Sequence, residues 1–287
     1  MEFLEILKVI LLGIVEGITE WLPISSTGHM LLLDGFWPLA VNDTFKQVFL
    51  YVIQLGAVLA VVCLFFKKIF PFALTKKEEN GIKKSKIVTK KETLLLWAKI
   101  LVACLPALIG LFLDMPESPL IIAIALIVYG VAFILVELLI KKKNKAFQVE
   151  DVSAITFKHA IIIGVFQVLA IIPGTSRSGI TILTALLIGI SRPAGAEFTF
   201  FLAIPVMLGA SLLKILKTLL DGYVFTGAEI GYLLIGAAVA FVVSMLAVKL
   251  LMSFVRKHDF TPFGWYRIGL GVVVIVLIAC NLLPAFV

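Results

Sequence analysis

Two stretches decide how this chain folds: EGITEWLPISSTGH (Glu16–His29) and QVLAIIPGTSRSG (Gln167–Gly179). Each interrupts an apolar run with a proline and a cluster of small polar residues. The two stretches align with one another without a gap, so that Ser25 falls on Ser176. We infer that the chain contains an internal repeat that has diverged in sequence.

The two copies differ at the positions that could carry chemistry. Where the first copy has Glu20, Ser26 and His29, the second has Ile171, Arg177 and Ile180. One copy therefore offers an acid, a hydroxyl and an imidazole, and the other offers a guanidinium. Polar groups are costly in lipid and mark functional sites, and repeats in membrane proteins meet near the bilayer midplane. The pattern predicts one site shared by the two halves.

The composition identifies an integral membrane protein. Of 287 residues, 61% are hydrophobic and 15% are charged, and the mean hydropathy is +1.13. A soluble domain is nearer half apolar and a quarter charged. Glu2 and Glu5 replace the basic start of a signal peptide, so we expect the N-terminus to be retained. The net charge of +7 lies mostly in lysine-rich loops and bears on topology and anionic lipid, so no nucleic-acid partner is expected.

Six apolar runs are long enough to cross a bilayer core, which needs about 20 residues. Together they predict an all-α integral membrane fold with six full spans. The runs are Phe45–Phe66, Leu94–Leu113, Pro119–Ile140, Phe198–Leu219, Ile230–Leu251 and Phe263–Leu283.

The loop charges predict the topology. Lys67–Lys91 and Lys141–Lys145 are rich in lysine, whereas Asp114–Ser118 and Asp221–Gly227 contain no basic residue. The positive-inside rule assigns the first pair of loops to the cytoplasm and the second pair to the outside. Each motif segment must then enter and leave on one side, as a re-entrant helix pair. The chain would be a single membrane domain of two inverted repeats, residues 1–150 and 151–287. The weaker alternative, in which each motif segment crosses once, conflicts with this parity.

The prolines create helix starts inside the membrane. Pro23 and Pro173 each remove a helix N–H, so a new helix is expected to begin at Ser25–Ser26 or at Ser176–Arg177. The first N–H groups of a helix have no internal partner and favour an anion, above all phosphate. Arg177 adds a forked donor that is always charged. These features predict a phosphate site.

The first copy supplies the groups that could react. Ser26 and His29 are three residues apart and would share a helix face, so we expect Ser26 to be the nucleophile with His29 taking its proton. The alternative is that His29 attacks phosphorus itself, and Glu20 could bind the metal or serve as the base. Glu16 and Glu20 are four apart, so both carboxylates would point the same way. Two acids in apolar surroundings need a proton, the arginine or a metal, and a divalent cation would suit a phosphate substrate.

Other charged residues in the apolar runs have structural interpretations. Glu137 and Lys141 are expected to lie at a span end with their charges reaching the surface, and Arg267 is expected to anchor a span end. Glu197, near a helix start, is expected to act as a cap. Gln54 could line a cavity or join two helices by a hydrogen bond.

The two motifs closely resemble the signature motifs of the bacterial undecaprenyl-pyrophosphate phosphatases, the family also linked to bacitracin resistance. The likeness covers essentially the whole chain, because it extends through FLYVIQLGAVLAV, EFTFFLAIPVMLGAS and YRIGLG. The resemblance implies hydrolysis of undecaprenyl pyrophosphate to the monophosphate carrier used in peptidoglycan synthesis. It also implies a multi-pass protein of the bacterial plasma (inner) membrane whose site faces outside. Bacitracin would compete indirectly, by binding the substrate, and a homodimer is left open.

The resemblance also implies roles for the motif residues. The catalytic group is Ser26, His29, Glu20 and Arg177. The substrate-binding group is Ser25, Ser176, Ser178 and Thr181, and to these we add Thr27 and Gly174 from the two polar stretches themselves. Glu16 and Glu20 would hold the divalent cation, Mg²⁺ or alternatively Ca²⁺.

A competing hypothesis belongs to another class. Inverted repeats with broken helices at the midplane are typical of transporters, so the chain could carry an anionic lipid or a small anion. A carrier needs groups that bind its cargo but has no use for a Ser–His pair beside two carboxylates. The motif residues therefore favour a hydrolase.

Overall fold

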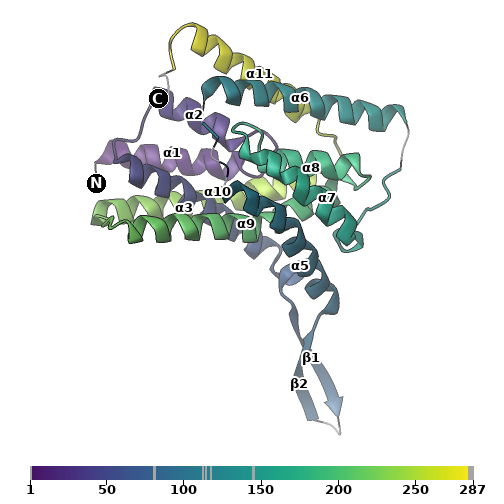
Figure 1. Ribbon diagram of the computed structural model, residues 1–287. Coiled ribbons are helices and arrows are strands. Elements are labelled where there is room, and N and C mark those ends of the chain that lie inside the picture. The colour runs from purple at the N-terminus through teal and green to yellow at the C-terminus, as the bar shows by residue number, and fades with distance from the viewer. Residues whose placement is uncertain are drawn as a thin grey trace.

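The computed structural model describes residues 2–79, 82–111, 113, 115–116, 118–143 and 146–283. It is a bundle of helices from which one β-hairpin projects (Figure 1). All six predicted spans are present as long apolar helices, which confirms the all-α membrane fold. They are α3 (Asp43–Leu64), α5 (Lys91–Cys104) with the following 3₁₀ turn (Leu105–Leu111), α6 (Pro119–Lys142), α9 (Arg192–Leu220), α10 (Gly227–Val255) and α11 (Thr261–Ala279).

Each motif lies between two short helices, as the prolines predict. The first joins α1 (Phe3–Thr19) to α2 (Ser26–Phe36), and the second joins α7 (Phe157–Gln167) to α8 (Arg177–Leu187) through a 3₁₀ turn, Val168–Ile171. A helix of 11 residues, the length of α2, α7 and α8, is about 16 Å long, about half of a bilayer core. In Figure 1 the pair α1–α2 lies toward the left of the bundle and the pair α7–α8 toward the right.

Helices that correspond in the two halves pack in corresponding pairs. Helix α1 packs on α10 and α7 packs on α5, while α3 packs on α10 and α5 packs on α9. Gly13 of α1 and its aligned counterpart Gly164 of α7 make the close approach in each half. A Cβ at Gly13 would lie 2.8 Å from the Gly236 carbonyl oxygen, and one at Gly164 would lie 2.4 Å from that of Ala103. This packing supports the internal repeat, and its inversion in the membrane stays a prediction.

The loop expected at Lys67–Lys91 contains secondary structure. After the short helix α4 (Phe66–Ile69), strands β1 (Phe72–Glu79) and β2 (Ile82–Thr89) pair antiparallel, with Phe72 opposite Thr89. The hairpin extends away from the bundle at the bottom of Figure 1. Its tip, Asn80 and Gly81, lies outside the described residues, as do Asp114, Glu117 and Lys145 of the other predicted loops.

Two acids differ from their sequence-based interpretations. Glu137 does not reach the surface: it is fully buried, and it accepts hydrogen bonds from the Arg192 guanidinium and the Phe260 backbone N–H. Glu197 is not a cap, because Ser191 caps α9 and Glu197 pairs with Lys68 at 2.7 Å. The starts of α9 and α11 cover Glu137, and α4 brings Lys68 to Glu197, which the span pattern alone cannot show.

Candidate active site

The two helix starts have the same unusual cap. Ser25 and Ser176 adopt φ values of 73° and 68°, a region that residues other than glycine rarely occupy. Each side chain accepts a hydrogen bond from the backbone N–H three residues on, at 3.3 Å from Gly28 and 3.1 Å from Gly179. Such backbone strain persists only where the surrounding structure enforces it, and it is concentrated at functional sites. Helices α2 and α8 therefore begin as the motifs predict, with matching geometry.

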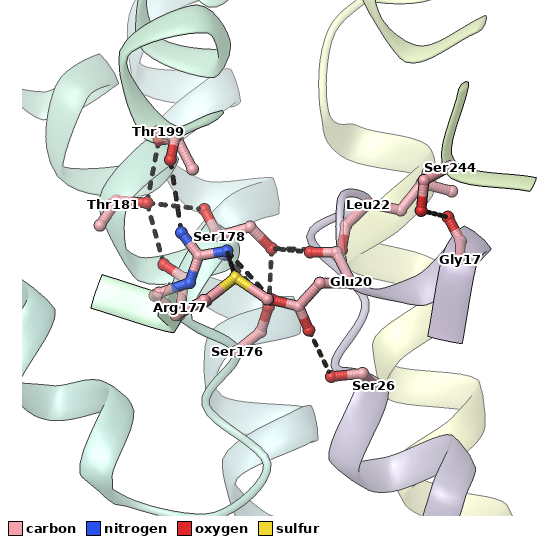
Figure 2. Close-up of polar contacts among 12 residues, drawn as sticks. Gly17, Glu20, Leu22, Ser26, Ser176, Arg177, Ser178, Thr181, Thr199 and Ser244 are labelled. Carbon is pink, nitrogen blue, oxygen red and sulfur yellow. Dashed lines mark hydrogen bonds and ion pairs between the residues drawn. The ribbon is translucent and has the colours of Figure 1, made fainter. Parts of the chain in front are cut away.

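The carboxylate of Glu20 connects the two repeats (Figure 2). Its Oε2 accepts a hydrogen bond from the Ser26 hydroxyl at 2.9 Å, and its Oε1 pairs with Arg177 Nη2 at 3.0 Å. The side chains of Glu20 and Arg177 are 9% and 12% exposed, so the pair is largely shielded from solvent. The structure thus brings an acid and a hydroxyl from one motif against the guanidinium of the other.

Further bonds fix the direction of the Arg177 side chain. Its Nη1 donates to the Thr199 carbonyl at 3.3 Å, and Nη2 also contacts the Met207 sulfur at 3.3 Å. Both partners belong to α9, and the pattern of motif residues gave no sign of either. Helix α9 therefore helps Glu20 to hold the guanidinium in place.

The hydroxyls predicted to bind phosphate also hold the two motifs together. Ser178 donates to the Glu20 carbonyl at 3.1 Å and lies 3.1 Å from the Ser176 hydroxyl. Thr181 donates to the Arg177 carbonyl at 2.9 Å and accepts a bond from the Thr199 hydroxyl at 2.9 Å (Figure 2). Ser178 and Thr181 are buried. Their hydroxyls are thus engaged in the described structure, where they position the Arg177 loop.

His29 does not form the predicted pair with Ser26. Its Nδ1 lies 2.7 Å from the Ser25 carbonyl, and its Nε2 lies 2.7 Å from the Tyr266 hydroxyl. A carbonyl only accepts, so Nδ1 carries the proton and Nε2 of the neutral ring accepts from tyrosine. The two rings also stack, with centroids 5.6 Å apart and planes 6° apart. Helical spacing correctly places Ser26 and His29 on one helix, but the imidazole turns toward α11 and the hydroxyl toward Glu20.

Arg267 is a site residue that the sequence analysis interpreted wrongly. It does not anchor a span end: it is fully buried and reaches both breaks at once. Its Nη1 donates to the Pro23 carbonyl at 3.1 Å, and Nη2 donates to the carbonyls of Gly174 and Thr175 at 2.9 and 3.0 Å. An arginine within an apolar span is a signal of function that would have identified this residue.

Gly174 lies where only glycine fits. Its φ is +89°, and a Cβ there would lie 2.6 Å from the Ile122 carbonyl oxygen of α6. Gly174 was predicted to bind substrate. In the structure its backbone passes against α6 and its carbonyl accepts from Arg267.

The residues predicted to hold a cation lie side by side. Glu16 is 2% exposed, it lies close enough to Glu20 for their charges to interact, and its Oε1 has no hydrogen-bond partner. A buried carboxylate oxygen without a partner is costly, so a ligand there would be stabilising. Oxygen donors suit Mg²⁺ or Ca²⁺. In the described part of the chain no three His, Cys, Asp or Glu side chains gather as a ready-made cage, so water or substrate oxygens would complete the shell of a bound cation.

A cavity of about 530 Å³ leads to the reactive groups. Glu16, Ser26 and Thr27 line it. Gln54 lines it too, as the first of its two interpretations predicts. The cavity also borders the apolar side chains of Leu12, Met30, Leu31, Phe49, Leu50 and Ile122. Polar groups with an apolar wall fit a ligand that has a charged head and a hydrocarbon chain.

Comparisons with known proteins agree with this picture. A family model described as "Bacitracin resistance protein BacA" matches residues 9–273. A protein of Enterococcus faecalis named undecaprenyl-diphosphatase is 54% identical over 285 residues, which cover 97% of this chain and 99% of that protein. A protein of the same name from Lachnoclostridium phytofermentans is 53% identical, covering 96% and 97% of the two chains. Undecaprenyl-diphosphatase 1 of Clostridium acetobutylicum is 52% identical, covering 96% and 98%.

Proposed function

This chain belongs to the BacA family of bacitracin resistance proteins, and we propose that it hydrolyses undecaprenyl pyrophosphate at the Glu20–Ser26–Arg177 cluster. It is a multi-pass membrane enzyme that releases phosphate from this lipid and leaves undecaprenyl phosphate. The main support for this site is that the Glu20 carboxylate bonds both the hydroxyl of Ser26 in the first motif and the guanidinium of Arg177 in the second.

In the proposed mechanism Ser26 is the nucleophile and Glu20 is its base. Glu20 Oε2, 2.9 Å from the Ser26 hydroxyl, takes the proton as the serine oxygen attacks the terminal phosphorus. The new Oγ–P bond forms as the P–O bond to the bridging oxygen breaks, and undecaprenyl phosphate leaves with the electron pair. This assignment replaces His29 as the base, because both nitrogens of that ring are bonded elsewhere.

Water completes the cycle. It attacks the phosphorus of the phosphoserine, the Oγ–P bond breaks, and Glu20 returns its proton to the serine oxygen. Inorganic phosphate then leaves, and it carries both protons of the attacking water. Arg177 and the first N–H groups of α2 and α8 are proposed to hold the phosphate oxygens on which charge develops. When the substrate binds, its phosphate would replace the Glu20 carboxylate as the partner of Arg177.

A divalent cation is part of the proposal. Glu16 and Glu20 would hold it, and when bound it would withdraw charge from the phosphate oxygens. The unpartnered Glu16 Oε1 supports this assignment. We expect the activity to fall with chelator and to recover with Mg²⁺ or Ca²⁺. Binding of the cation to the inactive Ser26→Ala protein, measured by calorimetry, would be lost in Glu16→Gln.

The proposed location is the bacterial plasma membrane with the site open to the outside. The lysine-rich loops support it, because Asp43 and Lys46, at the start of α3, line the cavity, whereas the lysine-rich segment Lys67–Lys91 follows the other end of that helix. Bacitracin would then reduce turnover by binding the substrate and not the enzyme.

The deciding experiment is phosphate release from an isoprenyl diphosphate by the purified protein. Ser26→Ala is expected to abolish turnover, and Glu20→Gln is expected to lower it at least about a hundredfold, the usual contribution of a general base. A denatured sample quenched during turnover should contain phosphoserine at Ser26. Phosphohistidine at His29 would overturn the nucleophile assignment, and wild-type rates in both variants would return the chain to the transporter hypothesis.

A further inference from the structure

A second cavity, of about 840 Å³, lies at the lysine-rich end of the bundle, away from the active site. It is formed where α3 ends, α4 follows and α10 ends. Its charged lining consists of five cations and one acid: Lys67, Lys68, Lys249, Arg256, Lys257 and Glu197. We name these residues with their cavity the basic pocket.

The single acid of the basic pocket is already neutralised. Both oxygens of Glu197 accept bonds from Lys68 Nζ, at 2.7 and 3.0 Å. Lys67, Lys249, Arg256 and Lys257 are exposed, and their side chains form no ion pair within the described residues. The pocket therefore presents an excess of uncompensated positive charge around one hollow.

The wall of the basic pocket is apolar. Phe65, Val248 and Met252 line it, and Phe66 borders it while remaining 49% exposed. Leu250, one turn from the end of α10, is 70% exposed on the outer surface of the same helix. Leu250 belongs to a span and Phe66 follows the end of one, so we place the pocket where the hydrocarbon region meets the headgroups.

We propose that the basic pocket binds the headgroup of an anionic phospholipid, such as phosphatidylglycerol, from the leaflet at the lysine-rich end. The phosphate lies among Arg256, Lys257 and Lys67, and an acyl chain lies along the apolar wall. Free phosphate would satisfy the cations but leave the wall uncovered. Basic pockets between spans on the cytoplasmic side bind such headgroups because each cation contributes to the attraction.

The test uses the full chain purified in detergent and native mass spectrometry with added dioleoyl-phosphatidylglycerol or dioleoyl-phosphatidylcholine. We expect at least tenfold tighter binding of phosphatidylglycerol. The triple variant Lys67→Gln, Arg256→Gln, Lys257→Gln should lose most of that preference, because each Lys or Arg contributes about fivefold. The matched control Lys91→Gln, Lys143→Gln, Lys158→Gln removes the same charge from the same end outside the pocket and should keep the preference.

A second variant separates the pocket from surface charge. Ser253 lines the cavity and is exposed, so Ser253→Trp fills the space without changing the charge. We expect it to weaken phosphatidylglycerol binding at least about fivefold while its thermal unfolding matches the wild type. Equal losses in the pocket and control variants, or full binding in Ser253→Trp, would overturn the site. Displacement of the lipid by equimolar inorganic phosphate would overturn the assignment to a lipid.

Discussion

At the residue scale, the guanidinium of Arg177 is proposed to exchange partners when the substrate binds. In the described structure it contacts a carboxylate, a carbonyl and a thioether sulfur, all from its forked end. A lysine carries the same charge but has one nitrogen at its tip, so it cannot reproduce this set.

We therefore expect Arg177→Lys to lower kcat/KM at least about tenfold, the scale of one lost bidentate contact. The measurement is phosphate release at several substrate concentrations. Thermal unfolding in the same detergent serves as the folding control, and it should shift little because the charge is kept beside Glu20. Near-normal turnover would remove Arg177 from the proposed phosphate site.

His29 and Tyr266 give a second prediction at this scale. If Glu20 is the base, His29→Ala should leave a residual rate well above that of Ser26→Ala, because the nucleophile and its base remain. Tyr266→Phe removes the hydroxyl bonded to His29 Nε2 but keeps the stacked ring, so a decrease of less than about tenfold is expected. A complete loss in Tyr266→Phe would instead place the His29–Tyr266 pair in the chemical step.

How far the sequence predicted individual residues depended on whether their partners lie nearby in the chain. Ser26 and Arg177 could be identified because a proline, small residues and an intramembrane charge occur together within a few positions. The partner predicted for Ser26 was His29, and this was wrong, because helical spacing puts two residues on one face without fixing which way their side chains turn. The φ of Ser25 and the course of the chain after Thr19 decide it.

At the scale of elements, α11 joins the two broken helix pairs through one side chain. Arg267 donates to carbonyls from both breaks, which have no helical partner of their own. The sequence predicted both breaks and the span, but it could not show that one side chain of the span reaches both breaks. The expectation that Arg267 anchors a span end was wrong for this reason.

Replacing this arginine should therefore destabilise the protein. Arg267→Met leaves three buried carbonyls without donors, and a loss of roughly 2–5 kcal/mol is expected. Arg267→Lys should recover part of it, since one nitrogen can still bond one or two carbonyls. Thermal unfolding in detergent measures the change. An unaltered unfolding temperature in Arg267→Met would show that the breaks hold their shape without this residue.

At the scale of the whole molecule, the matched packing of the two halves supports a repeat, and the loop charges predict that it is inverted. A cysteine introduced at Lys143 should react with a membrane-impermeant maleimide only from the cytoplasmic side, and one at Asp221 only from outside. The experiment needs a background without native cysteines, because Cys63 and Cys280 are exposed. Labelling of both positions from one side would contradict the inverted arrangement.

The structural features that the sequence did not predict depend on contacts between segments that lie far apart in the chain. The six spans were predictable because hydrophobic length alone determines them. The burial of Glu137 against Arg192 was not, since it depends on how the start of α9 covers the end of α6. The hairpin at β1 and β2 was also missed, because a lysine-rich segment resembles a solvated loop in composition.

The ion pair between Glu20 and Arg177 affects which lipids can bind at the proposed site. In the proposed site, an anion that binds Arg177 has to displace the Glu20 carboxylate, which lies 3.0 Å from the guanidinium. The phosphodiester of an ordinary phospholipid carries one delocalised negative charge. Replacing the Glu20 carboxylate with it would therefore gain little binding free energy. A terminal pyrophosphate carries more than one negative charge. We therefore expect the Glu20–Arg177 pair to disfavour the binding of ordinary phospholipids and to admit a lipid whose terminal phosphate carries more negative charge.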